Sequence, residues 1–225
     1  MTLSHPNDIR VYLALRSYCY SLYHLIFGAK PSIQVLDLVR SLKHQEILDV
    51  LTVESGDIFS QVKRYVSDPF EEAIDELESE YANLFIGPES PKAPPWESVY
   101  IGTENLLFQE STLEVRHIYH ECGFLPQEYP KVADDHIALM LDFMAHLSHQ
   151  AEEAFDKKSY GQMKKVLKAQ ALFLENHLMN WITQFRDILV SKATLPFYPY
   201  LIEYAIAFFS LDQKSLADAY VLTQG

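Results

Sequence analysis

Several residue types are scarce in this 225-residue sequence, and each scarcity excludes a class of protein. The only cysteines are Cys19 and Cys122, with no C-x-x-C motif, so we expect no disulfide framework and a reducing compartment, the cytoplasm. Seven unclustered glycines disfavour a turn-rich all-β fold and leave no glycine loop that could cradle a nucleotide phosphate. No apolar run approaches the roughly 18 residues of a membrane span, and charges interrupt the N-terminal run, so no secretory signal is expected.

Basic residues are also few, and this limits the classes of partner that the chain is expected to bind. The 18 lysines and arginines face 31 acids, for a net charge of −13. Nucleic acid and an anionic membrane are therefore disfavoured, whereas a cationic peptide is favoured. The region 65–115 holds twelve acids against one lysine. Three of them, Glu72, Glu76 and Glu80, are predicted to share the exposed side of one helix, as either a solvated face or a partner site.

What the sequence does contain is helical periodicity along most of its length. Gly28 followed by Pro31 predicts the end of a first helix, and Ser32 is expected to cap the second. A fourth helix should begin at Asp68 and Pro69 and end at Gly87, and Asp134 or Asp135 should cap a long one. The expected helices lie at about 7–27, 33–51, 57–66, 69–86, 111–122 and 135–155, with one or two in 160–192 and a pair in 197–222.

We therefore predict an all-α protein, an irregular helical bundle of about nine or ten helices. One domain over 1–225 is expected, and the loop with Pro126 and Pro130, near 125–133, is where any subdivision would fall. An alternative is a metal-dependent bundle enzyme. Its candidate ligands are a Glu-x-x-His pair on one helix and an acid with two histidines on another, namely Glu114, His117, Asp142, His146 and His149. Surface histidines explain the same pattern.

The segment Pro94–Tyr100, which follows the predicted fourth helix, is aromatic and rich in proline and is the main candidate for peptide binding. Trp and Tyr carry much of the energy at interfaces, and prolines limit the entropy that a loop loses when it binds. Alternatively, Trp96 in this segment could pack into the core and hold the loop in place. Further on, Asp135 beside His136 is either a helix cap with a polar neighbour or a carboxylate that orients an imidazole.

These motifs resemble the TorD/DmsD family of redox-enzyme maturation chaperones. The similarity runs from about Glu80 to Leu201 and rests on five motifs: Tyr81–Pro88, Pro94–Tyr100, Ser111–Arg116, Glu128-Tyr129-Pro130 with Asp135-His136, and His177-Leu178 with Trp181, Phe185 and Phe197-Tyr198. The stretch Lys131 to Asp134 separates the two halves of the fourth motif, which departs from the family pattern.

The resemblance implies an all-helical, non-enzymatic chaperone without a cofactor. It would bind the twin-arginine signal peptide of a molybdopterin-containing reductase of the dimethyl sulfoxide or trimethylamine N-oxide type, and hold the apoenzyme until cofactor insertion and export. Weak guanine-nucleotide binding, and a monomer or domain-swapped dimer, are implied by the family alone. A general acidic adaptor without preference for such a signal is a further alternative.

The predicted peptide-binding residues are Tyr81, Leu84, Phe85, Pro94, Trp96, Tyr100, Glu128, Pro130, Asp135 and His136. The apolar part of the signal would dock on Leu84, Phe85 and Trp96, while its arginines would meet Asp135 and glutamates nearby. In this hypothesis the segment Glu80 to Tyr100 forms one wall of a peptide groove, and Asp135 with His136 forms the opposite wall.

Overall fold

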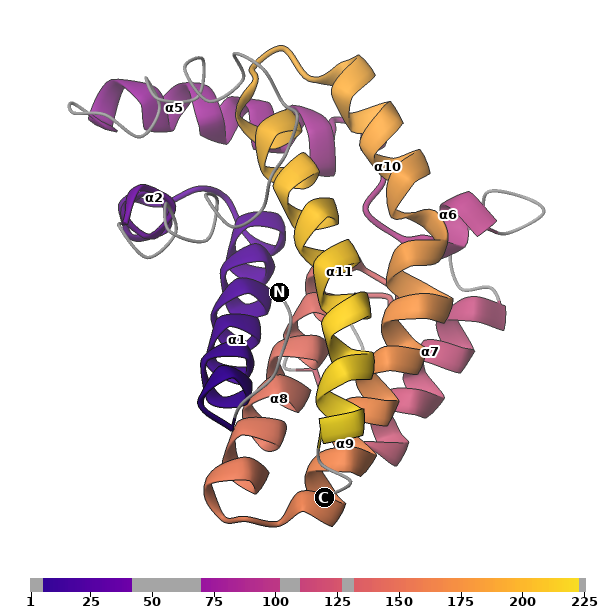
Figure 1. The fold of residues 1–225 in the computed structure, drawn as a ribbon. Helices are drawn as coiled ribbons and strands as arrows, with labels where there is room; N and C mark the ends of the chain where they lie inside the picture. The colour runs from indigo at the N-terminus through magenta and orange to yellow at the C-terminus, as the bar shows by residue number, and fades with distance from the viewer. Residues whose placement is uncertain (1–5, 42–69, 102–109, 127–131, 223–225) are drawn as a thin grey trace.

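The computed structural model describes residues 6–41, 70–101, 110–126 and 132–222, and these ranges are almost entirely helical (Figure 1). The α-helices are α1 (Pro6–Gly28), α2 (Ile33–Arg40), α5 (Phe70–Tyr81), α6 (Glu97–Ile101), α7 (Glu110–Glu121), α8 (Ile137–Asp156), α9 (Tyr160–Phe173), α10 (Met179–Lys192) and α11 (Phe197–Leu222). Two π-helical segments, η1 (Ala82–Ile86) and η2 (Leu174–Leu178), continue α5 and join α9 to α10. The predicted all-α irregular bundle is confirmed. No helix in the described ranges has the length and hydropathy needed to cross a bilayer.

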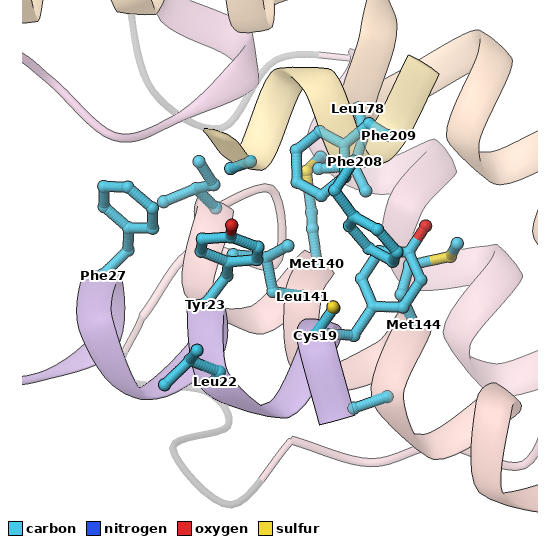
Figure 2. Close-up of a cluster of buried hydrophobic side chains, with 14 of the residues drawn as sticks. Cys19, Leu22, Tyr23, Phe27, Met140, Leu141, Met144, Leu178, Phe208 and Phe209 are labelled. Atoms are coloured by element: carbon cyan, nitrogen blue, oxygen red, sulfur yellow. The ribbon is translucent and has the colours of Figure 1, made fainter. Parts of the chain in front are cut away.

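The centre of the bundle is the pair α1 and α8, which pack along each other, with α9 against α8 and α11 against both α9 and α10. Figure 2 shows how side chains from four elements meet there. They are Cys19, Leu22, Tyr23 and Phe27 of α1, Met140, Leu141 and Met144 of α8, Leu178 of η2, and Phe208 and Phe209 of α11. Helical spacing of apolar residues in α1 therefore directs one face of it into the core.

A polar network is buried inside this apolar core. Arg16 on α1 is fully buried and pairs with Asp212 on α11, with its Nε 2.6 Å from Oδ1 and its Nη2 3.1 Å from Oδ2. The hydroxyls of Tyr12 and Tyr20 each donate to the same carboxylate at 2.6 Å, and Arg16 Nη1 donates to Gln170 on α9 at 2.7 Å. Because every charged atom has partners, the cost of burying the ion pair is offset, and the network links three helices.

Most helix boundaries follow the sequence signals. Ser32 caps α2, accepting from Val35 N at 3.3 Å, and Gly123 follows the end of α7 with φ of 69°. Gly87 ends η1 in the left-handed region, with its N–H donating to Ala82 O at 2.6 Å. The expected third helix, as well as Asp68 and Pro69, lies outside the described residues.

Three boundaries differ from the prediction. The second helix ends at Arg40 rather than Leu51, because Ser41 leaves the helical conformation and its N–H bonds to Leu38 O. His136, and not an aspartate, caps α8. The region 197–222 is one helix rather than a pair, since Pro199 stands in the first turn, where no N–H is required.

Candidate functional site

The predicted residues of the Tyr81–Pro88 motif face the core. Tyr81, Leu84 and Phe85 are all at least nine-tenths buried. Phe85 lies 5.1 Å from Tyr81 and 5.2 Å from Tyr198, measured between ring centroids, and 6.2 Å from Phe27. Burial raises the pKa of Tyr81 to about 12, so its hydroxyl stays neutral. These side chains support the segment from inside, and that any of them contacts a peptide stays a prediction.

Trp96 and His136 lie directly against each other. They form an isolated antiparallel bridge, in which Glu97 N donates to Asp135 O at 3.1 Å and Ile137 N donates to Pro95 O at 2.8 Å. The two rings meet edge to face at 5.2 Å. The fold thus places the two predicted segments side by side, joined by backbone hydrogen bonds. No groove separates the two predicted walls where Trp96 meets His136, and a groove formed by the rest of the Glu80–Tyr100 segment stays a prediction.

Asp135 is fully buried, and its carboxylate is used within the protein. One oxygen accepts from Ser98 N at 2.8 Å and the other from the Thr112 hydroxyl at 3.1 Å. The first of these bonds satisfies a free N–H at the start of α6, and the second holds α7. Asp135 therefore joins α6, α7 and the turn before α8, and the structure leaves its carboxylate no opening toward an arginine.

His136 has the capping role that the sequence analysis gave to an aspartate. Its Nδ1 accepts from Ala138 N at 3.1 Å, which requires that this nitrogen carries no proton. Burial, and then the neighbouring His24, lower the pKa of His136 to about 4. The half-buried ring is consequently neutral at physiological pH.

The remaining predicted positions divide into two groups. Tyr100 and Pro94 are half-buried, and the Tyr100 hydroxyl donates to Pro94 O at 2.8 Å while its ring stacks on Trp181 at 5.3 Å. They and the half-buried Trp96 keep part of their surface accessible. Glu128 and Pro130 lie outside the described residues.

A buried contact between a carboxyl and an imidazole, which the sequence did not predict, joins α6 to η2. Glu97, fully buried, faces His177 of η2, whose Nδ1 lies 3.1 Å from Oε2. Burial raises the pKa of the Glu97 carboxyl, and the contact with His177 opposes that rise. The π-helical turn orients His177 toward α6, and such turns are frequent at functional sites.

An acidic groove lies between the α5–η1 segment and the connection that joins α10 to α11. It has a volume of about 530 Å³ and is lined by Asp75, Glu76, Ser79, Glu80, Asn83, Thr194 and Leu195. The lining residues of α5 and η1 recur at helical spacing and form one stripe. None of the seven lining residues is basic, so the groove has a negative potential and suits a cationic group.

Glu80 joins the two sides of this groove. Its carboxylate accepts from Thr194 N at 2.6 Å, from Leu195 N at 3.0 Å and from the Thr194 hydroxyl at 2.8 Å. The predicted exposed position of Glu80 is wrong, since it is only 3% exposed. The hydrogen-bond partners of Glu80 lie more than a hundred residues away in the sequence. Helical periodicity around Glu80 therefore gives no sign of them. Asp75 and Glu76, by contrast, are exposed at the rim.

The residues of the alternative metal site do not come together. His117 pairs with Glu121 at 3.2 Å on the surface of α7, while His146 bonds Gln150 at 2.9 Å on α8. Within the ranges that the structure describes, no three His, Cys, Asp or Glu side chains gather as metal ligands would. The metal-enzyme hypothesis thus has no geometric support here.

Comparison with known proteins gives a consistent result. The family model described as nitrate reductase delta subunit matches residues 49–187, more than half of the chain. The chaperone protein TorD of Photobacterium profundum is 29% identical over 146 residues, which are 65% of this chain and 66% of that protein, slightly less than two thirds of its length. The chaperone protein TorD of Aliivibrio salmonicida is 23% identical over 94% of this chain and 99% of its own.

A solved structure is also similar. The crystal structure of an Archaeoglobus fulgidus protein described as a redox enzyme maturation protein has a TM-score of 0.42 and 19% identity, covering 96% of this chain and 97% of its own. This superposition is too loose to add to the assignment, which rests on the family model and the TorD relatives. The chain therefore belongs to the nitrate reductase delta subunit family, and within it resembles the chaperone proteins TorD.

Proposed function

We propose that this protein is a redox-enzyme maturation chaperone of the TorD/DmsD type. It binds, in the cytoplasm, the twin-arginine signal peptide of a molybdopterin-containing reductase of the dimethyl sulfoxide or trimethylamine N-oxide type. It holds the apoenzyme until the cofactor is inserted, and export follows. The observation that carries the proposal is the acidic groove, because one wall of it is the α5–η1 segment, and Asn83 of the family motif Tyr81–Pro88 lines it.

Asp75 and Glu76 at the rim are the groups that would meet the arginines. A guanidinium presents parallel N–H donors that fit a carboxylate in a two-bond fork, which an ammonium group cannot do. Glu80 would act indirectly, since its oxygens are occupied by Thr194 and Leu195. It fixes the distance between the two sides of the groove, so the carboxylates at the rim are held in place before a peptide arrives.

The apolar part of the signal would use the half-buried aromatic residues. Trp96 and Tyr100 are fixed by their contacts to His136 and Trp181, and therefore lose little entropy on binding. The chain's strong negative charge also speeds encounter with a cationic signal. A binding mode of this kind is reversible, as later release of the signal requires.

Calorimetric titration with a synthetic twin-arginine signal peptide tests the proposal. We expect binding that weakens at least tenfold when both arginines are replaced by lysine, because the fork is lost. The double variant Asp75→Asn/Glu76→Gln should weaken binding by a similar factor. The matched control is Glu89→Gln/Glu175→Gln, which removes the same charge from two exposed sites away from the groove.

Three outcomes would count against the proposal. A folded wild-type protein that binds no twin-arginine signal from its own genome contradicts it outright. Equal binding of the arginine, lysine and scrambled peptides would favour a general acidic adaptor. An equal loss of peptide affinity in both double variants would show that binding depends on the overall charge of the protein and not on the groove.

A further inference from the structure

Lysines are concentrated in the α8–α9 turn and in α9 of this acidic chain. Five lysines and no acid occur within 157–174, in a chain whose net charge is −13. They are Lys157, Lys158, Lys164, Lys165 and Lys168, which we call the lysine face. In Figure 1 this turn lies at the opposite end of the molecule from α5, which carries the acidic groove. The lysine face and the acidic groove thus lie at opposite ends of the molecule.

Two acids at the start of the lysine face form ion pairs. Glu153 pairs with Lys157 at 2.8 Å, and Asp156 pairs with Arg10 of α1 at 3.5 Å. Four of the five lysines form no ion pair with any described residue, namely Lys158, Lys164, Lys165 and Lys168. Their charge is consequently not neutralised locally and projects into solvent.

The shape of this face distinguishes between anionic partners. Lys165, Lys168 and Leu172 follow each other at spacings of three and four, so they share one exposed stripe of α9. Leu172 is 49% exposed and Tyr160, in the first turn of the helix, is 44% exposed. The result is a convex helix surface with cationic side chains and an apolar residue near each end. A lysine cluster of this size on a helix with exposed apolar residues is typical of contact with anionic headgroups.

We propose that the lysine face is a docking surface for an anionic lipid bilayer, on which the chaperone rests peripherally and without insertion. Lysines are compact point charges and fit a diffuse negative surface, whereas a specific acidic peptide or phosphate favours the planar fork of arginine. The overall negative charge does not prevent this contact. The bilayer's potential decays within about 10 Å at ordinary ionic strength, so only the near end of the chain experiences it. The acidic groove then faces away from the membrane.

Flotation of the purified full chain with lipid vesicles tests this docking. We expect binding to phosphatidylcholine vesicles that contain phosphatidylglycerol, none to phosphatidylcholine alone, and loss of binding at high salt. Each lysine near such a surface changes the partition coefficient by about fivefold. The double variant Lys165→Gln/Lys168→Gln should therefore bind roughly 25-fold more weakly.

The matched control is Lys92→Gln/Lys192→Gln, which removes two exposed lysines from other parts of the surface. It should bind vesicles as the wild type does, and circular dichroism should show unchanged helix content in both variants. Absence of wild-type binding to the anionic vesicles overturns the proposal, as does an equal loss in the control. Lysine-dependent binding to duplex DNA or to a poly-glutamate peptide, without vesicle binding, would assign the face to a different partner and also overturn it.

Discussion

The carboxylate of Asp135 accepts the backbone N–H of Ser98 at 2.8 Å, so a residue in the turn before α8 caps the first turn of α6. This bond makes the position of α6, and hence of Trp96 at its start, dependent on one side chain that has no contact with solvent. A loss of peptide binding on mutation of Asp135 therefore has two separable causes, loss of a contact or displacement of α6.

Replacement of Asp135 by Ala is expected to destabilise the protein by about 2–4 kcal/mol, because the buried Ser98 N–H and Thr112 hydroxyl each lose the acceptor that Asp135 provides. Asp135→Asn keeps an acceptor and should cost less. Urea unfolding followed by circular dichroism gives both values. Unchanged stability of the Ala variant together with lost peptide binding would contradict the positioning role and indicate direct contact.

His136 predicts how stability depends on pH. Its pKa is about 4 in the folded protein and near 6.5 when unperturbed, so the unfolded chain takes up this proton first as the pH falls. Stability should decrease between pH 6.5 and pH 4, by about 2 kcal/mol for a half-buried ring. His136→Asn keeps a helix cap without titrating, and should flatten this part of the profile.

Comparing the wild type with His136→Asn isolates the contribution of His136 to the pH dependence of stability. Glu97 has a raised pKa and acts in the opposite sense, contributing stability at low pH that is lost as the pH rises, but it is present in both proteins. Parallel profiles for the two proteins would contradict the assignment.

Glu80→Ala should destabilise the protein by about 2–3 kcal/mol and weaken signal-peptide binding, since three hydrogen bonds to Thr194 and Leu195 are lost and the groove loses its brace. Glu78→Ala is the control from the same helix. Glu78 makes an exposed contact with Lys30 at 3.4 Å, so its loss should cost less than about 0.5 kcal/mol. Similar costs for the two variants would refute the role given to Glu80.

Two glycines with the same backbone conformation should respond differently to alanine. Gly87 has φ of 67°, and a Cβ there would clash with Ser90 O, whereas Gly123 has φ of 69° and no atom within 4 Å of the Cβ position. Gly123→Ala should cost about 1 kcal/mol of left-handed strain. Gly87→Ala should cost several times more, because the loop to Ser90 must move. Thermal unfolding measures both, and equal shifts in Tm would contradict this reading.

The sequence predicts local structure well where the signal and its effect are close together. Ser32, Gly28 and Gly87 end or cap helices as their chemistry requires, and apolar spacing in α1 identifies its buried face. The prediction fails where a neighbour is distant in sequence. Asp135 has the character of an N-cap, as expected, but it caps α6 instead of its own helix, because the antiparallel bridge from Trp96 to His136 brings α6 beside it.

The candidate site shows the same division. Family motifs in the sequence identified the segment that forms one wall of the groove, and the acidic excess indicated the sign of its charge. The opposite side, Thr194 and Leu195, was missed because it becomes a wall only through the bonds to Glu80. Likewise, Glu97 and His177 are 80 residues apart, and nothing in either segment signals the other.

The buried pair of Arg16 and Asp212 has a consequence for synthesis of the chain. The two residues are 196 positions apart, and α1 leaves the ribosome long before α11. Until α11 arrives, Arg16 has no carboxylate to neutralise it at the centre of the bundle, so the core cannot close around it. Closure of this core therefore requires α11, and we expect a fragment that ends before α11 to leave the core open.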